Sequence, residues 1–400
     1  MKTRWLFVVA GAAGSLHAAA LLAACATDSE VGAPPPDEAN APIPATDAGS
    51  DSDDADGAVC VGEDCEFYPA ECTDDALCAG GLFNPSDPSG NLGLDLRTHI
   101  TALAARSPTD VWVAGTVGQL GHFDGTSWRP SSLGTQQSIW GLWLYGNAEI
   151  AFDEPSRLYT RGLDAGADAS TSADGWSFVG AATLSGTWNS RARVMATWAH
   201  PNAASLWVGV DSPSYGGGLW RMRRDAETGT FTAIEMPFNS VLTNVHGLFG
   251  LSADELWAVG TRGAACRITN AESDTPTFTT FNALTMMALE GVWAASSNDV
   301  WAVGSTGTVR RYRGDARFWE IYEEVPTKQH LLAIAGSSPK DIWIVGDAAT
   351  VFHYDGASWK RVKIAGLGQR RPRLEHVWVP SPGKVWIAGQ GVLVSLGGKP

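Results

Sequence analysis

The chain has 400 residues, including 18 Trp and 45 Gly, with 44% hydrophobic residues and a formal net charge of −15 at pH 7. The hydrophobic content excludes a wholly disordered chain, and the acidity excludes a protein that binds nucleic acid through a basic surface. Residues 26–79 contain 15 acidic and no basic residues, so the rest of the chain is close to neutral. The net charge therefore says little about the partners of residues 80–400.

Residues 1–24 predict an export signal, because two basic residues precede an uncharged and mostly apolar run over 5–24. Gly, Ser and His interrupt this run, which argues against the alternative of a membrane-spanning helix. The run ends in Leu-Ala-Ala-Cys at Cys25, which resembles the bacterial lipoprotein box. This resemblance implies cleavage before Cys25 and its lipidation, so the lipid would be the only contact with the membrane. Ala26, rather than Asp, follows the Cys, which favours the outer over the inner membrane.

Residues 25–59 predict a disordered acidic linker, because they are rich in Pro, Ala, Asp and Ser and contain no aromatic residue. Residues 60–80 predict a small Cys-rich segment. In an exported chain, four closely spaced Cys favour two disulfides over a zinc site, with three connectivities possible. These Cys are Cys60, Cys65, Cys72 and Cys78. The remaining Cys266 lies in an apolar strand, which predicts a buried and inert thiol.

A motif of the form Asp-Val-Trp-x-x-Gly recurs along residues 81–400, most clearly at 110–115, 299–304 and 341–346. Spacings of 39 to 56 residues separate seven copies, of which the second has Ala at the Trp position. We call these Trp and Ala positions the anchors: Trp112, Ala151, Trp207, Trp257, Trp301, Trp343 and Trp386. A repeat of this length is typical of a β-propeller blade.

Each copy divides into four short strands rich in β-branched and aromatic residues, and Asp-Gly pairs such as Asp355-Gly356 provide tight turns. We therefore expect an all-β fold, a monomeric seven-bladed propeller of four-stranded antiparallel blades over 81–400. The last copy lacks a fourth strand. Residues 92–97 are strand-like and are expected to complete that blade, so that a charge at Leu94 would lower the melting temperature. Most of the Trp residues fall at repeat positions, which predicts packing between blades rather than a ligand-binding ring.

The motif, with its following Tyr/Phe-Asp-Gly-x-Ser-Trp, resembles the repeat of bacterial propeller lipoproteins of myxobacterial type. It is also distantly similar to WD40, sialidase-type (BNR) and photosystem-assembly-factor repeats. The adjacent Asp124-Gly125 and Asp355-Gly356 depart from the sialidase Asp-box. A hydrolase activity therefore does not follow from the resemblance.

No residues predict catalysis, and no cofactor or metal ligand set is expected. The repeated Asp110, Asp299 and Asp341 are predicted to be turn residues that bind backbone amides. His122 and His353 are expected on an exposed strand face. The other His residues considered, at different distances from their anchors, predict no metal ring: His99, His246, His330 and His376.

Two long insertions, 162–175 and 211–229, interrupt the second and third copies. The second insertion predicts either a binding loop or an irregular third strand. Its candidate binding residues are Tyr215, Trp220, Arg221, Arg223 and Arg224. We expect a non-enzymatic binding or scaffolding platform at the cell envelope, with a protein or glycan partner. The alternatives are a glycan-active hydrolase or lyase, with Arg, carboxylate and Tyr at a channel mouth, and a purely structural surface protein.

Overall fold

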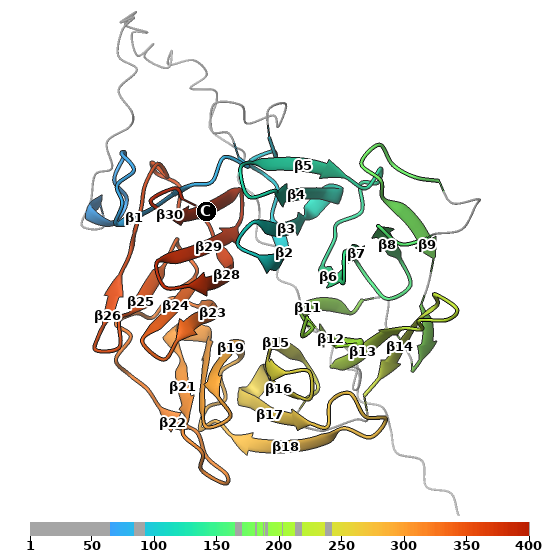
Figure 1. The fold of residues 1–400 in the computed structure, drawn as a ribbon. Helices are drawn as coiled ribbons and strands as arrows, with labels where there is room; N and C mark the ends of the chain where they lie inside the picture. The colour runs from blue at the N-terminus through green and yellow to red at the C-terminus, as the bar shows by residue number, and fades with distance from the viewer. Residues whose placement is uncertain are drawn as a thin grey trace, which may run out of the picture. The chain divides into compact units, whose positions relative to one another are not determined.

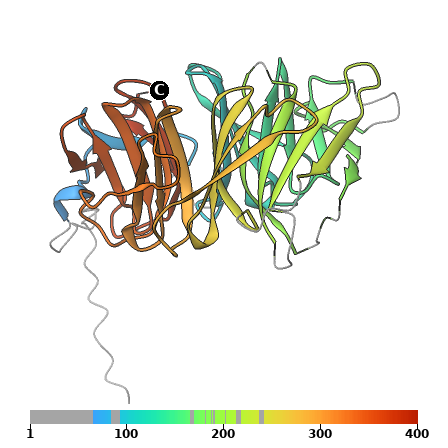
Figure 2. The same ribbon diagram turned by 90° about the horizontal axis from the view of Figure 1, so that it is seen from below.

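The protein is a seven-bladed β-propeller in a computed structural model (Figure 1). The structure describes residues 65–83, 93–164, 170–180, 182–186, 188, 191–201, 203–212, 218–236 and 242–399, all within one compact unit. Five antiparallel sheets have four strands, and two have a fifth strand at the outer edge. The strands of each blade run between the two faces of the ring (Figure 2). This confirms the fold predicted from the repeat.

Each blade uses its strands in the same order from the channel outward. The innermost strands are β2 (Ile100–Ser107), β6 (Gly141–Tyr145), β11 (Arg193–Trp198), β15 (Val245–Ser252), β19 (Leu289–Ser296), β23 (Leu331–Ser338) and β28 (Leu374–Ser381). The second strands are β3 (Asp110–Gly115), β7 (Ala148–Phe152), β12 (Ser205–Asp211), β16 (Glu255–Gly260), β20 (Asp299–Gly304), β24 (Asp341–Gly346) and β29 (Lys384–Gly389).

The third strands are β4 (Gln119–Phe123), β8 (Leu158–Arg161), β13 (Leu219–Arg224), β17 (Ala264–Thr269), β21 (Val309–Tyr312), β25 (Val351–Tyr354) and β30 (Val392–Leu396). The fourth strands are β5 (Trp128–Ser132), β9 (Ser177–Gly180), β14 (Phe231–Glu235), β18 (Thr277–Asn282), β22 (Glu320–Ile321), β26 (Trp359–Arg361) and β1 (Ala76–Ala79). The two added edge strands are β10 (Thr183–Ser185) and β27 (Lys363–Ile364).

All seven anchors lie on second strands, and their exposed fractions are at most 3%. Both faces of a second strand are covered by neighbouring blades, which is why these strands are almost uninterrupted runs of apolar residues. A buried Trp removes roughly 200 Å² from water, or about 5 kcal/mol as an upper bound. The high Trp content therefore stabilises the ring.

Aromatic residues of the innermost strands also pack across blade boundaries. The ring of Trp198 lies over Gly250 of the next blade, where an added Cβ would be 2.1 Å from an indole carbon. Trp293 and Gly336 repeat this arrangement, with a corresponding distance of 2.9 Å. Glycine at these two positions leaves the space that the neighbouring indole fills.

The ring is closed by a strand from the N-terminal side, but not by the predicted residues 92–97. Strand β1 pairs antiparallel with β30 and parallel with β27, so it becomes the fourth strand of the last blade. Leu94 instead forms an isolated bridge with Phe83 and packs in a core cluster that includes Trp386. The prediction of this segment was wrong because Leu94 and Leu96 pack in that core cluster instead of joining the sheet of the last blade. A charge at Leu94 would perturb this packing without testing the closure.

A disulfide joins Cys72 to Cys78, and Cys78 lies within β1. Cys65 is disulfide-bonded too, and Cys60 lies outside the described residues. Cys266 is a free, buried thiol, and burial raises its pKa to about 12, so it is unreactive as predicted. Among the described residues, no helix is long and apolar enough to cross a bilayer.

Candidate functional site

A cavity of about 570 Å³ runs through the centre of the ring and is lined by the innermost strands of all seven blades. This volume lies within the usual range of ligand sites in proteins. Its middle level is a ring of aliphatic side chains from six blades: Leu103, Leu142, Leu248, Val292, Ile334 and Val377. We call the end at which the innermost strands begin the channel mouth, and the surrounding surface the mouth face.

The channel mouth holds a histidine–glutamate pair from neighbouring blades. Nδ1 of His246, at the start of β15, lies 2.7 Å from Oε2 of Glu290, at the start of β19. Burial alone would lower the pKa of His246, but the hydrogen bond and charge of Glu290, with the charge of Asp211, outweigh it and raise the pKa. The His246 side chain is 10% exposed, and among the described residues its Nε2 has no hydrogen-bond partner.

A second pair lies between the first and last blades. Nε2 of His99 contacts Oε2 of Glu375, and Nε of Arg373 donates to Oε1 of the same carboxylate at 2.5 Å. Burial would raise the pKa of Glu375, but the hydrogen bond of His99 and nearby positive charges lower it, so this group is ionised. Burial lowers the pKa of His376, which lines the same cavity, and this favours the neutral imidazole. Both oxygens of Glu375 are thus already engaged by this chain.

Exposed apolar side chains concentrate on the mouth face. Of the nine large hydrophobic residues that are exposed in the described part of the chain, five lie there. Met195 lies near the start of β11, and Val117 is in the turn between β3 and β4. The other three are in the loop from β18 to β19. The five are Val117, Met195, Leu284, Met286 and Met287, and Met286 is 74% exposed. Flexible Met side chains adapt to differently shaped partners.

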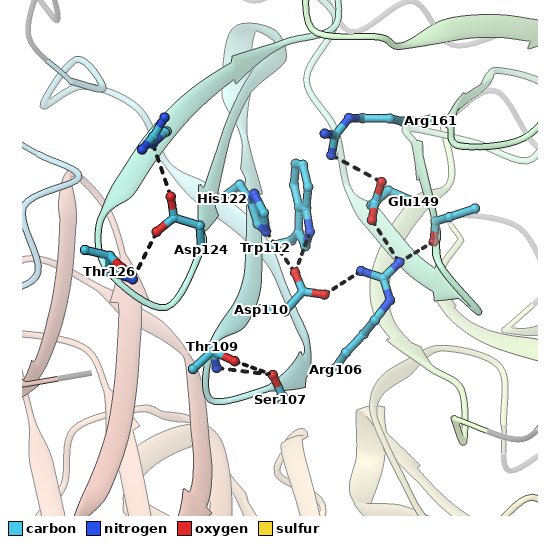
Figure 3. A network of polar contacts seen from close by, with 12 residues as sticks. Arg106, Ser107, Thr109, Asp110, Trp112, His122, Asp124, Thr126, Glu149 and Arg161 are labelled. Atoms are coloured by element: carbon cyan, nitrogen blue, oxygen red, sulfur yellow. Dashed lines mark hydrogen bonds and ion pairs between the residues drawn. The ribbon is translucent and has the colours of Figure 1, made fainter.

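Away from the mouth, the repeated Asp residues form side-chain clusters. Nε1 of Trp112 donates to Asp110 at 3.1 Å, and Nε2 of His122 lies 2.8 Å from the same oxygen (Figure 3). The imidazole stacks on the indole, with ring centroids 4.1 Å apart. The expected backbone-amide partners of Asp110 and the exposed position of His122 were therefore wrong. The side-chain hydrogen bonds arise because residues two apart on a strand share a face, and β4 places His122 opposite Trp112.

The same cluster recurs in other blades. Asp341, Trp343 and His353 repeat it, with Nε1 of Trp343 donating at 3.0 Å and Nε2 of His353 at 2.7 Å from Asp341. In the fifth blade, the Arg311 guanidinium bonds to Asp299 at 2.8 Å and lies 4.3 Å from the Trp301 ring centroid. The predicted Asx turn occurs elsewhere, where Asp124 and Asp355 accept backbone amides. These clusters hold strands together and present no free nucleophile or base.

Arg106 lines the cavity near its far end and is paired with carboxylates, and both residue types are expected of the hydrolase or lyase alternative. Its guanidinium bonds to Asp110 at 2.8 Å, to Glu149 at 2.9 Å, and to the carbonyl oxygens of Gly146 and Ala148 (Figure 3). Nη1 thus bonds within the first blade, whereas Nε and Nη2 join the first blade to the second. This arrangement supports a structural role for Arg106.

The predicted binding residues of the third copy form a regular strand, β13. Trp220 and Arg221 are 1% and 2% exposed, and Arg221 bonds to the carbonyl oxygens of Ala271 and Ser273 in the next blade. Arg223 bonds to Ser205 and lies 3.7 Å from Glu272. The loop interpretation was wrong for these residues because the arginines bridge two blades. Arg224 ends the strand half-buried, and Tyr215 and Cys25 lie outside the described residues.

Sequence reasoning missed the pairs at the channel mouth. His246, Glu290 and Glu375 each lie 11 residues before their anchors, as do Thr101, Trp140 and Leu332. Equivalent positions of consecutive copies form one level of the channel, so this shared offset was the available signal. Among the described residues, no group of three or more His, Cys, Asp or Glu side chains is placed to hold a metal ion.

Comparison with known proteins supports the fold. No family model matches the chain, and no curated protein matches its sequence. A structure of YCF48 bound to a D1 peptide is similar, with a TM-score of 0.54 and 16% identity over 75% of this chain and 92% of that chain. YCF48 from Cyanidioschyzon merolae has a TM-score of 0.54 and 12% identity, over 76% and 97%. The WD40 propeller domain of Doa1 has a TM-score of 0.52 and 12% identity, over 74% and 92%. The distant similarity to such propellers is thus confirmed for the fold alone.

Proposed function

We propose that this chain is a non-enzymatic binding platform whose mouth face takes a peptide segment of a partner protein. The concentration of exposed apolar side chains on the mouth face carries this proposal, because soluble proteins otherwise keep such residues apart. The Asp–His–Trp clusters hold strands of one blade together and Arg106 joins two blades, which leaves the mouth face as the site for a ligand. The YCF48 structure with a bound peptide supports the same use of this fold.

A matched pair of variants tests the platform. The double variant Met286→Glu/Met287→Glu places charges on the mouth face, and Phe318→Glu/Ile321→Glu places charges on exposed apolar positions at the outer edge of the adjacent blade. We expect the first variant alone to lose a partner that is captured by the wild-type chain from envelope extracts. Equal loss in both variants, or in neither, would contradict the use of the mouth face.

We further propose that the protein is exported and anchored by a lipid on Cys25, at the outer membrane rather than the inner. The uncharged run over 5–24 and the Leu-Ala-Ala-Cys sequence support this. Cys25→Ser should abolish labelling by radioactive palmitate and release the chain from the membrane fraction, whereas Cys266→Ser should retain both. Labelling that persists in Cys25→Ser would refute the attachment of a lipid to Cys25.

A further inference from the structure

In five blades, the innermost strand has one extra residue at the channel mouth, which its pairing with the second strand skips, as in a β-bulge. These bulged residues are Thr101, His246, Glu290, Leu332 and Glu375. All five line the cavity, as do Trp140 and Ala196 at the equivalent positions of the second and third blades. Bulges re-aim side chains and are frequent beside functional sites. We call these seven positions the mouth level.

Glu290 provides the mouth level with an uncommitted hydrogen-bond acceptor. Its Oε2 lies 2.7 Å from Nδ1 of His246, whereas its Oε1 has no partner among the described residues. Oε1 is not buried, unlike Nε2 of His246, and the Glu290 side chain is 20% exposed. Both oxygens of Glu375, by contrast, are engaged by His99 and Arg373. A carboxylate oxygen only accepts hydrogen bonds and is stabilised most by a charged donor, so a cationic group in the mouth fits Glu290.

The channel wall below the mouth level is apolar. Leu248 and Val292 follow His246 and Glu290 by two residues on the same strands and belong to the aliphatic ring of the channel. Successive strand residues rise by about 3.3 Å, so this ring lies roughly 6 Å deeper than the mouth level. A charge carried to that depth loses its hydration without gaining a partner. A fitting ligand therefore keeps its positive charge at the mouth level and places an apolar group beneath it.

The amino-terminal residue of a peptide meets both conditions. Its α-carbon carries the ammonium, the side chain and the rest of the chain as separate branches. The ammonium therefore reaches Glu290 while the side chain enters the aliphatic ring and the chain continues over the mouth face. A lysine side chain has the opposite order, because its four-carbon stem would carry the ammonium past Glu290 into the apolar wall. An internal or acetylated amide nitrogen lacks the positive charge.

We propose that the channel mouth captures the free amino end of a peptide whose first residue has an aliphatic side chain, with the ammonium bound to Oε1 of Glu290 and the side chain against Leu248 and Val292. This inference rests on the proposed peptide-binding function. It goes beyond that function by naming the end of the peptide that binds and the residue that recognises it. Glu290 is thereby a specificity-determining residue.

Three synthetic pentapeptides with fluorescein at the carboxyl end test this recognition. One begins with leucine and has a free amino end, the second is the same peptide with an acetylated amino end, and the third begins with serine and has a free amino end. Dissociation constants for the full chain are measured by fluorescence anisotropy. We expect the first peptide to bind the wild type about tenfold more tightly than either of the others, since they lack the charged hydrogen bond or the apolar contact.

Glu290→Gln and Glu255→Gln form a matched pair of variants. Each removes one carboxylate charge, but Glu255 forms an ion pair with Arg267 and does not line the cavity. We expect Glu290→Gln to weaken binding of the leucine peptide about tenfold and to abolish its advantage over the acetylated peptide. Glu255→Gln should leave all three dissociation constants unchanged within about twofold. Thermal unfolding of each variant verifies that it is folded.

An NMR titration of the methyl resonances locates the bound side chain. The leucine peptide should shift the resonances of Leu248 and Val292 in the wild type, and the serine peptide should not. Equal binding of the free and acetylated peptides, an advantage of the free amino end that survives in Glu290→Gln, or binding without these shifts would overturn this inference and leave the platform intact. Absence of binding by all three peptides would overturn it too, whereas the capture of a partner by the mouth face decides the platform separately.

Discussion

Replacing Leu77 by Ala tests the strand that closes the ring. Leu77 is fully buried in β1, in a core cluster that includes Tyr68, Ile364 and Val394. The substitution removes three carbon atoms, worth about 2.4 kcal/mol in transfer free energy, and the cavity adds to this loss. We therefore expect the free energy of unfolding to fall by about 3 to 4 kcal/mol. The midpoint of urea unfolding should fall by roughly 1 M.

Leu256→Ala in β16 is the matched control, because Leu256 is equally buried but lies on a second strand in the middle of its sheet. Both variants should lose similar stability in urea, followed by Trp fluorescence. Only in Leu77→Ala should the β30 amides exchange hydrogen faster than the amides of the other blades, because β1 covers the edge of β30. An unchanged midpoint, or β30 exchange equal in both variants, would refute closure by β1.

Three further outcomes are expected. Serine at both Cys72 and Cys78 should destabilise the chain by about 2 kcal/mol, since the disulfide closes a short loop; an unchanged melting temperature would count against this. Gly250→Ala should cost about 1–3 kcal/mol in chemical denaturation, because the new Cβ overlaps the indole packed over it, and full tolerance would contradict that packing. Glu290→Gln should lower the pKa of His246 in NMR titration. Because the pKa of His246 in the folded chain is raised above 6.5, the stabilisation by the pair is fully present below pH 6.5. It is lost as the pH rises through the folded pKa. A difference in unfolding free energy between wild type and variant that does not change with pH would refute this.

The blade architecture could be predicted from sequence because the anchors sit on strands that are covered on both faces. Burial on both sides forces the same apolar residues and the same turn chemistry in every copy, as Trp301 and Trp343 illustrate. The closing strand could not be predicted in the same way. β1 has four residues and includes two small side chains and a disulfide cysteine, so it lacks the alternation that marks a strand. Its position depends on β27 and β30, which lie about 300 residues away in sequence.

The channel mouth was missed for a related reason. His246 and Glu290 belong to different copies and meet only because consecutive blades place equivalent positions side by side. Their shared offset from the anchors is visible in the sequence, but a His and a Glu at one offset do not form a metal-ligand pattern. The arginines of β13 show the converse error. Arg221 and Arg223 break the repeat, but they do so to contact the next blade, at Ala271 and Glu272.

The disulfide at β1 also determines how the ring responds to force. A pull transmitted along the chain from before residue 65 passes the buried Tyr68 and then reaches Cys72. There the covalent bond to Cys78 carries the tension past the residues between the two cysteines. Ala76 and Leu77, which pair with β27, lie inside this bypassed segment and are not stretched. The load instead enters the sheet at Cys78, in register with Ser395 of β30. The closing strand is thus mechanically reinforced at the end of the propeller on which any tether would pull.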